Sequence, residues 1–471
     1  MMKAFLSRNR NFVICCAIIA VVYLLDSLLF FSQFYLMYDF YSKKTIGAVS
    51  TGWAYLAQGA GLVLFIILYK TRTCLSARRV FQVLLFLIEV PVIIASILMP
   101  GRILLMIMII ILNIIIGLHT GFTFTLAAAH VPASRLGLCY GLAYAVGAFG
   151  TWLISAISGG VMTSFRIIFI DSVLIALIVV FILMYRDAFV NERDGEPDGE
   201  DDDPEARELL PDTAKDRRIL ILLCVVIAIM APISSIGTNN NLYVQYSSEL
   251  NLLAQRSFYA IGLIAAGLIF DKNRIIGGVC AVVSLIYPIV LIMIYRESGL
   301  VTLVIGLSYA ILGFYAVYRA ASFMALASES RRLHLAPLGL VVARVCEAVA
   351  VLVLTETGCD ELTSVILVSV LFIPLVIVFF MMVKEKYSPA EVSAEAQREL
   401  SAEERRAAFA GQYGLTRREE EIAMFLAEGR SNGEIAELLQ LSENTVRFHV
   451  SNILKKTGMK DRNEVSRAYR L

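Results

Sequence analysis

The sequence lacks any spacing of cysteine and histidine that would hold a metal ion or form a disulfide framework. Its eight cysteines are scattered without a CxxC pair, and the chain has only four histidines. There is also no phosphate-binding P-loop, no GxGxxG turn beside a strand and no nucleophile with a base at a motif spacing. We therefore expect no metal, no cofactor and no enzymatic activity.

Charged residues are scarce as well. They make up 17% of the chain, whereas hydrophobic residues make up 58% and the mean hydropathy is +0.73. These values exceed what a soluble domain shows. The composition excludes a soluble enzyme and predicts a protein that crosses a membrane many times.

Twelve apolar segments are candidates to cross about 30 Å of hydrocarbon. In the first half of the chain they are 12–31, 49–69, 80–99, 103–126, 137–158 and 167–185. In the second half they are 219–237, 257–270, 276–295, 301–321, 335–354 and 362–383. The sequence thus predicts an all-α membrane domain over 1–386, with halves 1–186 and 217–386. Residues 187–216, which include GEPDGEDDDPE, are too acidic to fold alone and predict a cytoplasmic linker.

An even number of spans places both termini on the same side of the membrane. With both ends in the cytoplasm, most loop lysines and arginines also fall on that side, as the positive-inside rule requires. The outer loops then carry only Lys43, Lys44, Arg102, Arg166, Arg256 and Arg296. We expect a multi-pass protein of the bacterial cytoplasmic (inner) membrane.

Ionisable residues within the spans are expensive to bury and indicate function or internal pairing. They are Asp26, Glu89, His119, Asp171, Arg319, Arg344 and Glu347. Arg344 and Glu347 stand three residues apart and can pair on one helix face. For a small-molecule site between the two halves, the candidate residues are Asp26, Arg319, Arg344, Glu347 and His119. The glycines at 137, 141, 147 and 150 indicate close helix packing.

Residues 414–471 have the start and stop signals of four helices, and residues 387–413 predict a helical connector. Thr416 with Glu419 opens the first helix, and Gly429 ends it. Ser431 with Glu434 opens a second, short helix. After a tight turn, Ser442 begins a longer helix that ends at Gly458. This is the helix-turn-helix arrangement, and from Ser442 onward basic residues outnumber acidic ones.

The segment LTRREEEIAMFLAEGRSNGEIAELLQLSENTVRFHVSNILKKTG closely resembles the LuxR-type helix-turn-helix family. It matches the family's LTxRE start, its SNxEIA helix and its TVxxHxxxIxxK recognition helix. The resemblance implies that Thr445, Val446, Arg447, His449 and Lys456 touch DNA and that Ser431 and Asn432 position the phosphate backbone. Asn452 projects from the same helix and joins the candidates. Arg447 stands where the family commonly has lysine, and Thr457 where it commonly has leucine.

Six plus six helices around a central cytoplasmic loop resemble the major facilitator superfamily. After the eighth span, Gly267, Asp271, Lys272 and Arg274 match part of its GxxxD(R/K) loop. The stretch after the second span, YKTRTCLSARR, lacks the glycine and the aspartate.

The two resemblances together predict a membrane-bound one-component transcriptional regulator. Its bundle would sense a ligand or a membrane condition, and a homodimer would bind double-stranded promoter DNA. The alternatives are a major-facilitator-type transporter with an autoregulatory DNA-binding tail, and a bundle that only anchors the tail.

Overall fold

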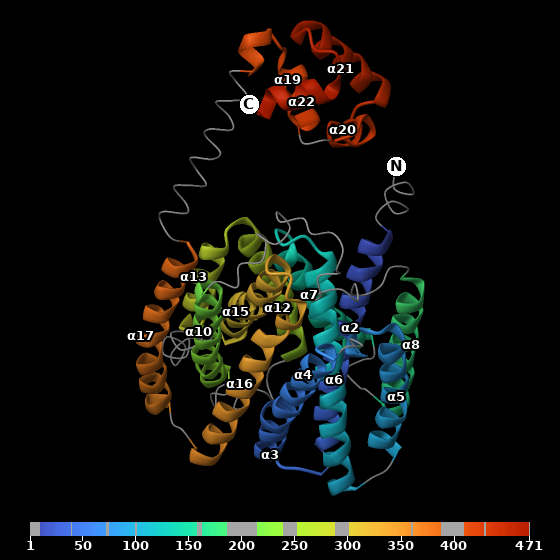
Figure 1. Cartoon of the computed structure of the whole chain (residues 1–471). Coiled ribbons are helices and arrows are strands. Elements are labelled where there is room, and N and C mark those ends of the chain that lie inside the picture. Colours follow the sequence, from blue (N-terminus) through green and yellow to red (C-terminus); the bar gives the residue numbers. More distant parts are fainter. Residues whose placement is uncertain are drawn as a thin grey trace. The chain divides into compact units, whose positions relative to one another are not determined.

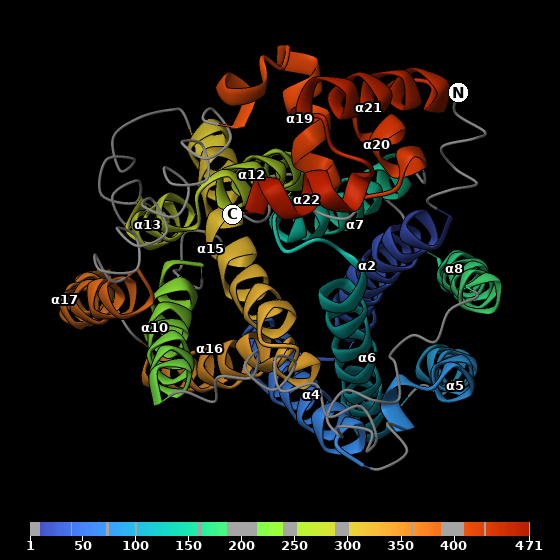
Figure 2. The ribbon, with the colours of Figure 1, turned by 45° about the horizontal axis from the view of Figure 1, so that its top comes forward.

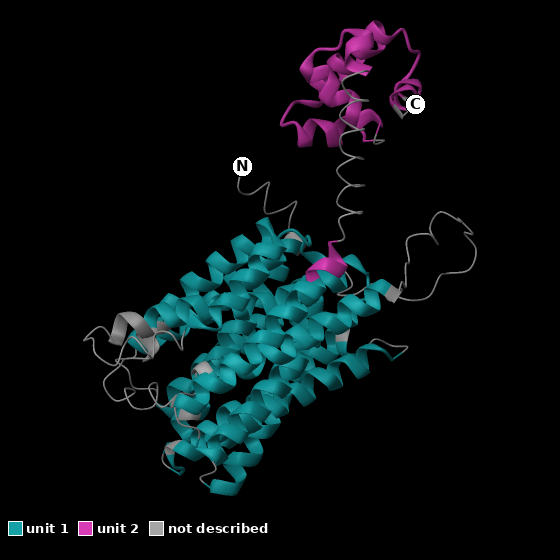
Figure 3. Ribbon diagram, turned by 90° about the vertical axis from the view of Figure 1, so that its left-hand side faces the viewer, with its two compact units in different colours: residues 1–382 teal, residues 383–471 magenta. Residues whose placement is uncertain are grey.

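The computed structural model describes residues 10–38, 40–71, 75–98, 101–157, 163–185, 214–238, 252–287, 301–358, 361–387, 409–427 and 430–470. Every regular element in these ranges is helical. The chain divides into two compact units, Met1–Met382 and Val383–Leu471 (Figures 1 and 3). Most of the expected linker 187–216 and of the expected connector 387–413 lies outside the described residues.

The membrane unit is a bundle of long apolar helices, because a helix satisfies its backbone polar groups internally and so tolerates hydrocarbon. The first half contains α2 (Arg10–Met37), α3 (Lys43–Gly47), a π-helix η1 (Ala48–Trp53), α4 (Ala54–Tyr69), a 3₁₀ turn η2 (Leu75–Ala77), α5 (Arg79–Leu98), α6 (Arg102–His130), α7 (Leu136–Ile157) and α8 (Ser164–Met184). The second half contains α10 (Ala214–Thr238), α12 (Leu252–Lys272), α13 (Arg274–Ser284), α15 (Val301–Glu329), a 3₁₀ turn η3 (Leu333–Leu335), α16 (Leu338–Thr357) and α17 (Glu361–Lys386).

Ten helices within the described residues are long and apolar enough to cross a membrane, and they coincide with ten of the twelve predicted spans. The other two predicted spans coincide with α12 and α13. The end of the predicted span 276–295 lies outside the described residues, so only the first part of that span is seen as α13.

Helix α12 packs directly against α7 and α15 (Figure 2). Close approach requires glycine at the crossing points. A Cβ atom on Gly262 would lie 1.8 Å from the carbonyl oxygen of Ala310 on α15, and one on Gly141 of α7 would lie 2.3 Å from the carbonyl oxygen of Leu263. The glycines of the fifth span therefore serve helix packing, as their spacing predicts.

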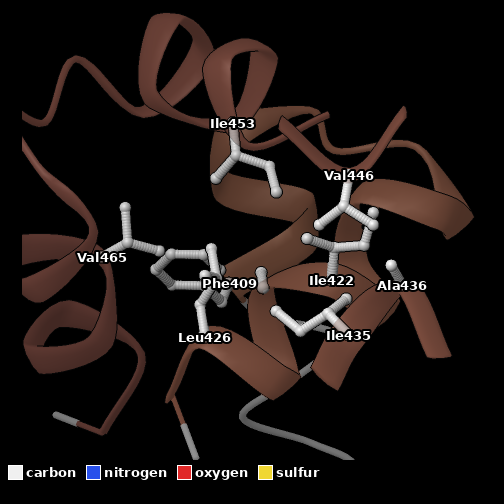
Figure 4. Close-up of a cluster of buried hydrophobic side chains, with 9 residues drawn as sticks. Phe409, Ile422, Leu426, Ile435, Ala436, Val446, Ile453 and Val465 are labelled. Carbon is white, nitrogen blue, oxygen red and sulfur yellow. The ribbon is translucent and has the colours of Figure 1, made fainter. Parts of the chain in front are cut away.

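The C-terminal unit contains α19 (Arg417–Ala427), α20 (Asn432–Leu438), α21 (Glu443–Thr457) and α22 (Arg462–Arg470). All four helices contribute to one apolar core (Figure 4). Its buried members are Phe409, Ile422, Ala423, Leu426, Ile435, Ala436, Val446, Ile453 and Val465. The unit thus has a core of its own.

The helix boundaries of this unit follow the sequence signals. Ser431 and Glu434 form a complete capping box on α20, and the hydroxyl of Ser442 accepts the backbone N–H of Thr445 at the start of α21. Gly458 adopts φ +71°, the left-handed conformation expected after the end of α21. These predicted boundaries are confirmed, whereas the expected helix end at Gly429 lies outside the described residues.

We predict that Gly262→Ala destabilises the membrane unit, because the new methyl group overlaps the backbone of α15 and the helices must separate. Overpacking of this kind costs about 1–3 kcal/mol or more. The measurement is the thermal loss of monodisperse, detergent-solubilised protein in size-exclusion chromatography. Gly47→Ala is the matched control, since a Cβ atom there meets no atom within 4 Å. Equal stability of the two variants would contradict the close crossing.

Candidate DNA-binding and ligand-binding sites

The helix-turn-helix is formed by α20, α21 and the tight turn between them. At the start of α20 the backbone N–H of Ser431 donates to Glu434 at 2.7 Å. In the turn, Gln440 has φ +55°, and the N–H of Leu441 donates to the carbonyl of Ala436 at 2.7 Å. These local bonds fix the direction in which α21 leaves the turn.

The two faces of α21 have different roles. Val446 and Ile453 are fully buried and hold the helix on the core. Arg447 is exposed and pairs with Glu443 at 2.7 Å, a contact between two exposed side chains of the same helix. Because the side chain of Val446 points into the core, it supports the helix from the inside and is not presented to solvent.

Two polar atoms among the DNA-binding candidates lack a hydrogen-bond partner within the described part of the chain. They are Oδ1 of Asn432, at the start of α20, and Nδ1 of His449, on α21. Phe448, which the motif reasoning did not single out, lies beside His449 with ring centroids 5.9 Å apart. Its side chain is 63% exposed. The exposure of Phe448 could not be recognised from the sequence, because it depends on knowing which face of α21 is buried.

The amine of Lys456 is bound within the unit. It donates to Glu419 at 2.5 Å and to the carbonyl oxygen of Gly414 at 3.0 Å. The same oxygen of Glu419 accepts the N–H and the hydroxyl of Thr416 at 2.8 and 2.9 Å. Burial by itself would raise the pKa of Glu419, but the hydrogen bonds from Lys456 and Thr416 hold the pKa below its usual value. This contact ties α19 to α21.

In the membrane unit, the carboxylate of Glu347 on α16 collects three donors. Arg344 on the same helix approaches at 3.1 Å, so the expected pair with a spacing of three residues is confirmed. Arg319 on α15 forms a second ion pair with it, and the hydroxyl of Tyr315 donates at 2.9 Å. Sequence reasoning named these charges but not the tyrosine or the contact between the two helices.

A cavity of about 110 Å³ lies beside this network. Side chains from both halves of the unit line it, namely Tyr23, Asp26, Ser27, Phe30, Tyr55, Gln58, Ile116, Thr120, Tyr140, Tyr144, Arg319, Leu340 and Arg344. The guanidinium of Arg344 lies 3.8 Å from the centre of the Tyr55 ring. The structure thus brings Asp26, Arg319 and Arg344 together, whereas His119 lies against Glu89 and Phe86. Within the described residues no group of three or more acidic, histidine or cysteine side chains could hold a metal ion.

Two family descriptions match the chain. The Major Facilitator Superfamily matches residues 15–355, and the family of bacterial regulatory proteins called luxR matches residues 414–468. The chain belongs to the Major Facilitator Superfamily. Residues 414–468, within its C-terminal unit, form a LuxR-type helix-turn-helix domain.

Solved structures of transporters share the superfamily fold. The human organic anion transporter MFSD10 (TETRAN) has a TM-score of 0.54 and 11% identity, with 79% of this chain and 99% of that chain covered. The POT family transporter PepTSo has a TM-score of 0.56 and 11% identity, with 80% of this chain and 99% of that chain covered. At this identity the likeness concerns the fold alone.

The LuxR-type domain is similar to curated regulators. The uncharacterized transcriptional regulatory protein YhcZ of Bacillus subtilis is 48% identical over 54 residues, which is 12% of this chain and 25% of that protein. The regulatory protein DegU of Brevibacillus brevis is 50% identical over 50 residues, which is 11% of this chain and 21% of that protein. The chain therefore spans about a quarter of the length of the curated relatives it matches.

The superfamily's motif at the junction of α12 and α13 connects the two halves of the bundle. Asp271 accepts the N–H groups of Gly137 and Leu138 at the start of α7, each at 2.8 Å. Arg274 pairs with Glu329 and donates to the carbonyl oxygen of Ala133 at 3.1 Å. This contact holds the loop of the second half against the first half, although the corresponding stretch after α4 lacks the motif.

We predict that the stability of the LuxR-type domain falls as the pH is lowered below about 4.3, the ordinary pKa of glutamate. Folding lowers the pKa of Glu419, so its contribution is present above the unfolded pKa and is lost as the pH falls through the folded value. Urea unfolding of residues 383–471, followed by circular dichroism at several pH values, measures this. Glu419→Gln should flatten the acid limb more than Glu443→Gln, which removes a carboxylate whose ion pair with Arg447 is exposed to solvent. An unchanged acid limb in Glu419→Gln would refute the role of this contact.

Proposed function

We propose that this protein is a membrane-bound one-component transcriptional regulator. One observation carries the proposal: a LuxR-type domain with an outward polar face on α21 is joined to a membrane unit that has a cavity lined by Asp26, Arg319 and Arg344. The first feature suits promoter DNA, and the second suits a small molecule. The alternative is a transporter with a DNA-binding tail, and the contact of Asp271 with the start of α7 is the observation that supports it. Uptake assays in vesicles distinguish a transporter from a regulator that does not transport.

In this proposal, α21 enters the major groove of the duplex. Thr445, Arg447 and His449 reach base edges or nearby phosphates, with Asn452 on the same side of the helix. Phe448 lies among them and offers an apolar surface of the kind that contacts a thymine methyl group. Ser431 and Asn432, at the amino end of α20, lie where backbone N–H groups favour a phosphate.

Lys456 and Val446 have a supporting part in this arrangement. Lys456 is exposed enough to attract phosphate through its charge, while its bond to Glu419 sets the angle of α21. Val446 fixes the same helix from the core. Both residues would influence DNA binding through the position of the helix.

We further propose that a small polar molecule binds in the cavity between the halves. Arg344 and Arg319 offer positive charge beside Tyr55, and Asp26 offers an acceptor on the opposite element α2. Glu347 orients the two arginines from behind. A ligand that binds one bundle conformation better than another by about 1–3 kcal/mol would shift the population of the two.

We place the protein in the bacterial cytoplasmic membrane with both termini in the cytoplasm, as the distribution of loop cations favours. We also propose that two chains pair on DNA, since one helix-turn-helix makes few base contacts and dimers read two-fold-related half-sites. A strictly monomeric domain that binds the promoter equally well would rule out the pairing.

We predict that Arg447→Ala weakens promoter binding and reduces the slope of log K against log salt concentration by about one, because one phosphate-neutralising charge is lost. Gel shifts at several salt concentrations measure both quantities. Arg417→Ala is the control, since that side chain is 93% exposed and lies on α19. If Arg447→Ala and Arg417→Ala have the same small effect, α21 is not the reading helix.

We predict that a chain without residues 1–386 still binds the promoter but loses its response to growth conditions, because the sensing cavity is gone. Transcript levels from the occupied promoter, compared across conditions in cells with the full or the shortened chain, test this. Regulation that persists unchanged in the shortened chain would show that the bundle is only a tether.

A further inference from the structure

Two cysteines on different helices of the membrane unit lie against each other. Cys16 is on α2 and Cys139 is on α7, and the thiol of Cys139 donates a hydrogen bond to the sulfur of Cys16. Both thiols are free and half-buried. The adjacent Cys15 is fully buried, and its thiol donates to the carbonyl oxygen of Leu126 on α6 at 3.9 Å. The two neighbouring cysteines of α2 therefore contact different helices, and only Cys16 is directed to α7.

The packing of α2 on α7 holds the two thiols in this position. Farther along the same helices, the rings of Tyr23 and Tyr140 have centroids 5.4 Å apart, and a Cβ atom on Gly147 would lie 2.6 Å from the carbonyl oxygen of Tyr23. Cys16 stands seven residues before Tyr23, and Cys139 stands eight residues before Gly147. Each interval is about two helical turns. The two helices therefore run parallel between these contacts, and the close approach at Gly147 keeps the cysteines together.

The cysteine pair lies near one end of the bundle. Cys139 is the fourth residue of α7, directly after Arg135, and Cys16 is the seventh residue of α2, which begins at Arg10. Cys16 is thus about 10 Å from the start of its helix. A small uncharged oxidant reaches half-buried thiols at this depth. In the orientation proposed above this end faces the cytoplasm, where thiols are kept reduced and disulfides are transient and redox-sensing.

We infer that Cys16 and Cys139 form a reversible disulfide site that reacts with hydrogen peroxide. One thiol, as its thiolate, attacks the O–O bond, which breaks to leave a sulfenic acid, and the departing hydroxide takes up the thiol proton as water. The second thiol then attacks this sulfur, the S–O bond breaks, and a second water leaves with the other thiol proton. The two sulfurs lose two electrons, and the peroxide gains them. A dithiol reductant reverses the reaction.

The disulfide joins α2 to the part of α7 that contacts the second half of the bundle. Gly137 and Leu138, whose N–H groups donate to Asp271, directly precede Cys139. A covalent bond at Cys139 therefore restricts the movement of this segment against α2. The membrane unit thus has a site for oxidant in addition to the cavity, and the two sites share no residue.

Thiol mapping by mass spectrometry tests the site on the full chain in lipid nanodiscs. The chain is treated with hydrogen peroxide, its remaining thiols are blocked with N-ethylmaleimide in detergent, and it is cut with trypsin, which releases residues 11–43 and 136–166. The expected result is a cross-link between these two peptides and the loss of two maleimide-reactive thiols per chain, both restored by dithiothreitol. Cys16→Ser and Cys139→Ser each abolish the cross-link. Cys15→Ser retains it, as does the matched control Cys224→Ser, which changes a half-buried cysteine on α10.

Fragment-ion sequencing of the cross-linked peptide from the unaltered chain assigns the bonded sulfurs without any variant. Assignment to Cys16 and Cys139 supports the inference. A bond to Cys15 overturns it, and so does a peroxide-treated chain in which Cys16 and Cys139 stay reactive to maleimide or are oxidised separately to sulfinic acids. Neither readout involves DNA or a cavity ligand, so its failure would leave the proposed regulatory function standing.

Discussion

The membrane unit depends on the rule that a charge in hydrocarbon must find its partner inside the protein. Glu347 satisfies this rule by accepting bonds from Arg319, Arg344 and Tyr315. Removing one partner from a buried ion pair costs about 3–5 kcal/mol, so this contact fixes α15 against α16. The same arginines form one wall of the cavity. The ion-pair network that stabilises the bundle therefore also provides the candidate binding surface. A ligand that moved Arg319 or Arg344 would change the packing of α15 against α16.

The LuxR-type domain is small and its helices lie in water, so its apolar core is small. Polar contacts at the helix ends therefore also contribute to its stability. The capping box at Ser431 sets α20, and the bond between Lys456 and Glu419 joins α21 to α19. With these bonds made inside the unit, Arg447 and Phe448 stay exposed on α21. The exposed face is what recognition of a duplex requires.

Local features of the sequence predicted the local features of the structure. Run length predicted the spans, the capping residues predicted α20 and α21, and the spacing of Arg344 and Glu347 predicted their pair. Contacts between helices could not be predicted, because periodicity says which face is polar and not which helix it meets. For that reason the sequence did not show that Arg319 reaches Glu347, that His119 meets Glu89, or that Lys456 is bound to Glu419. The boundaries of the linker and the connector stay predictions.

The central claim is that a chain embedded in the membrane presents its LuxR-type domain to chromosomal DNA. Cross-linking of the full chain to DNA in living cells, followed by isolation of the membrane fraction and sequencing of the attached fragments, tests it most directly. The account predicts discrete enriched promoters that disappear when Thr445, Arg447 and His449 are together replaced by alanine. Enrichment no greater than that of the triple variant, or a C-terminal reporter that is active only outside the cytoplasm, would contradict it.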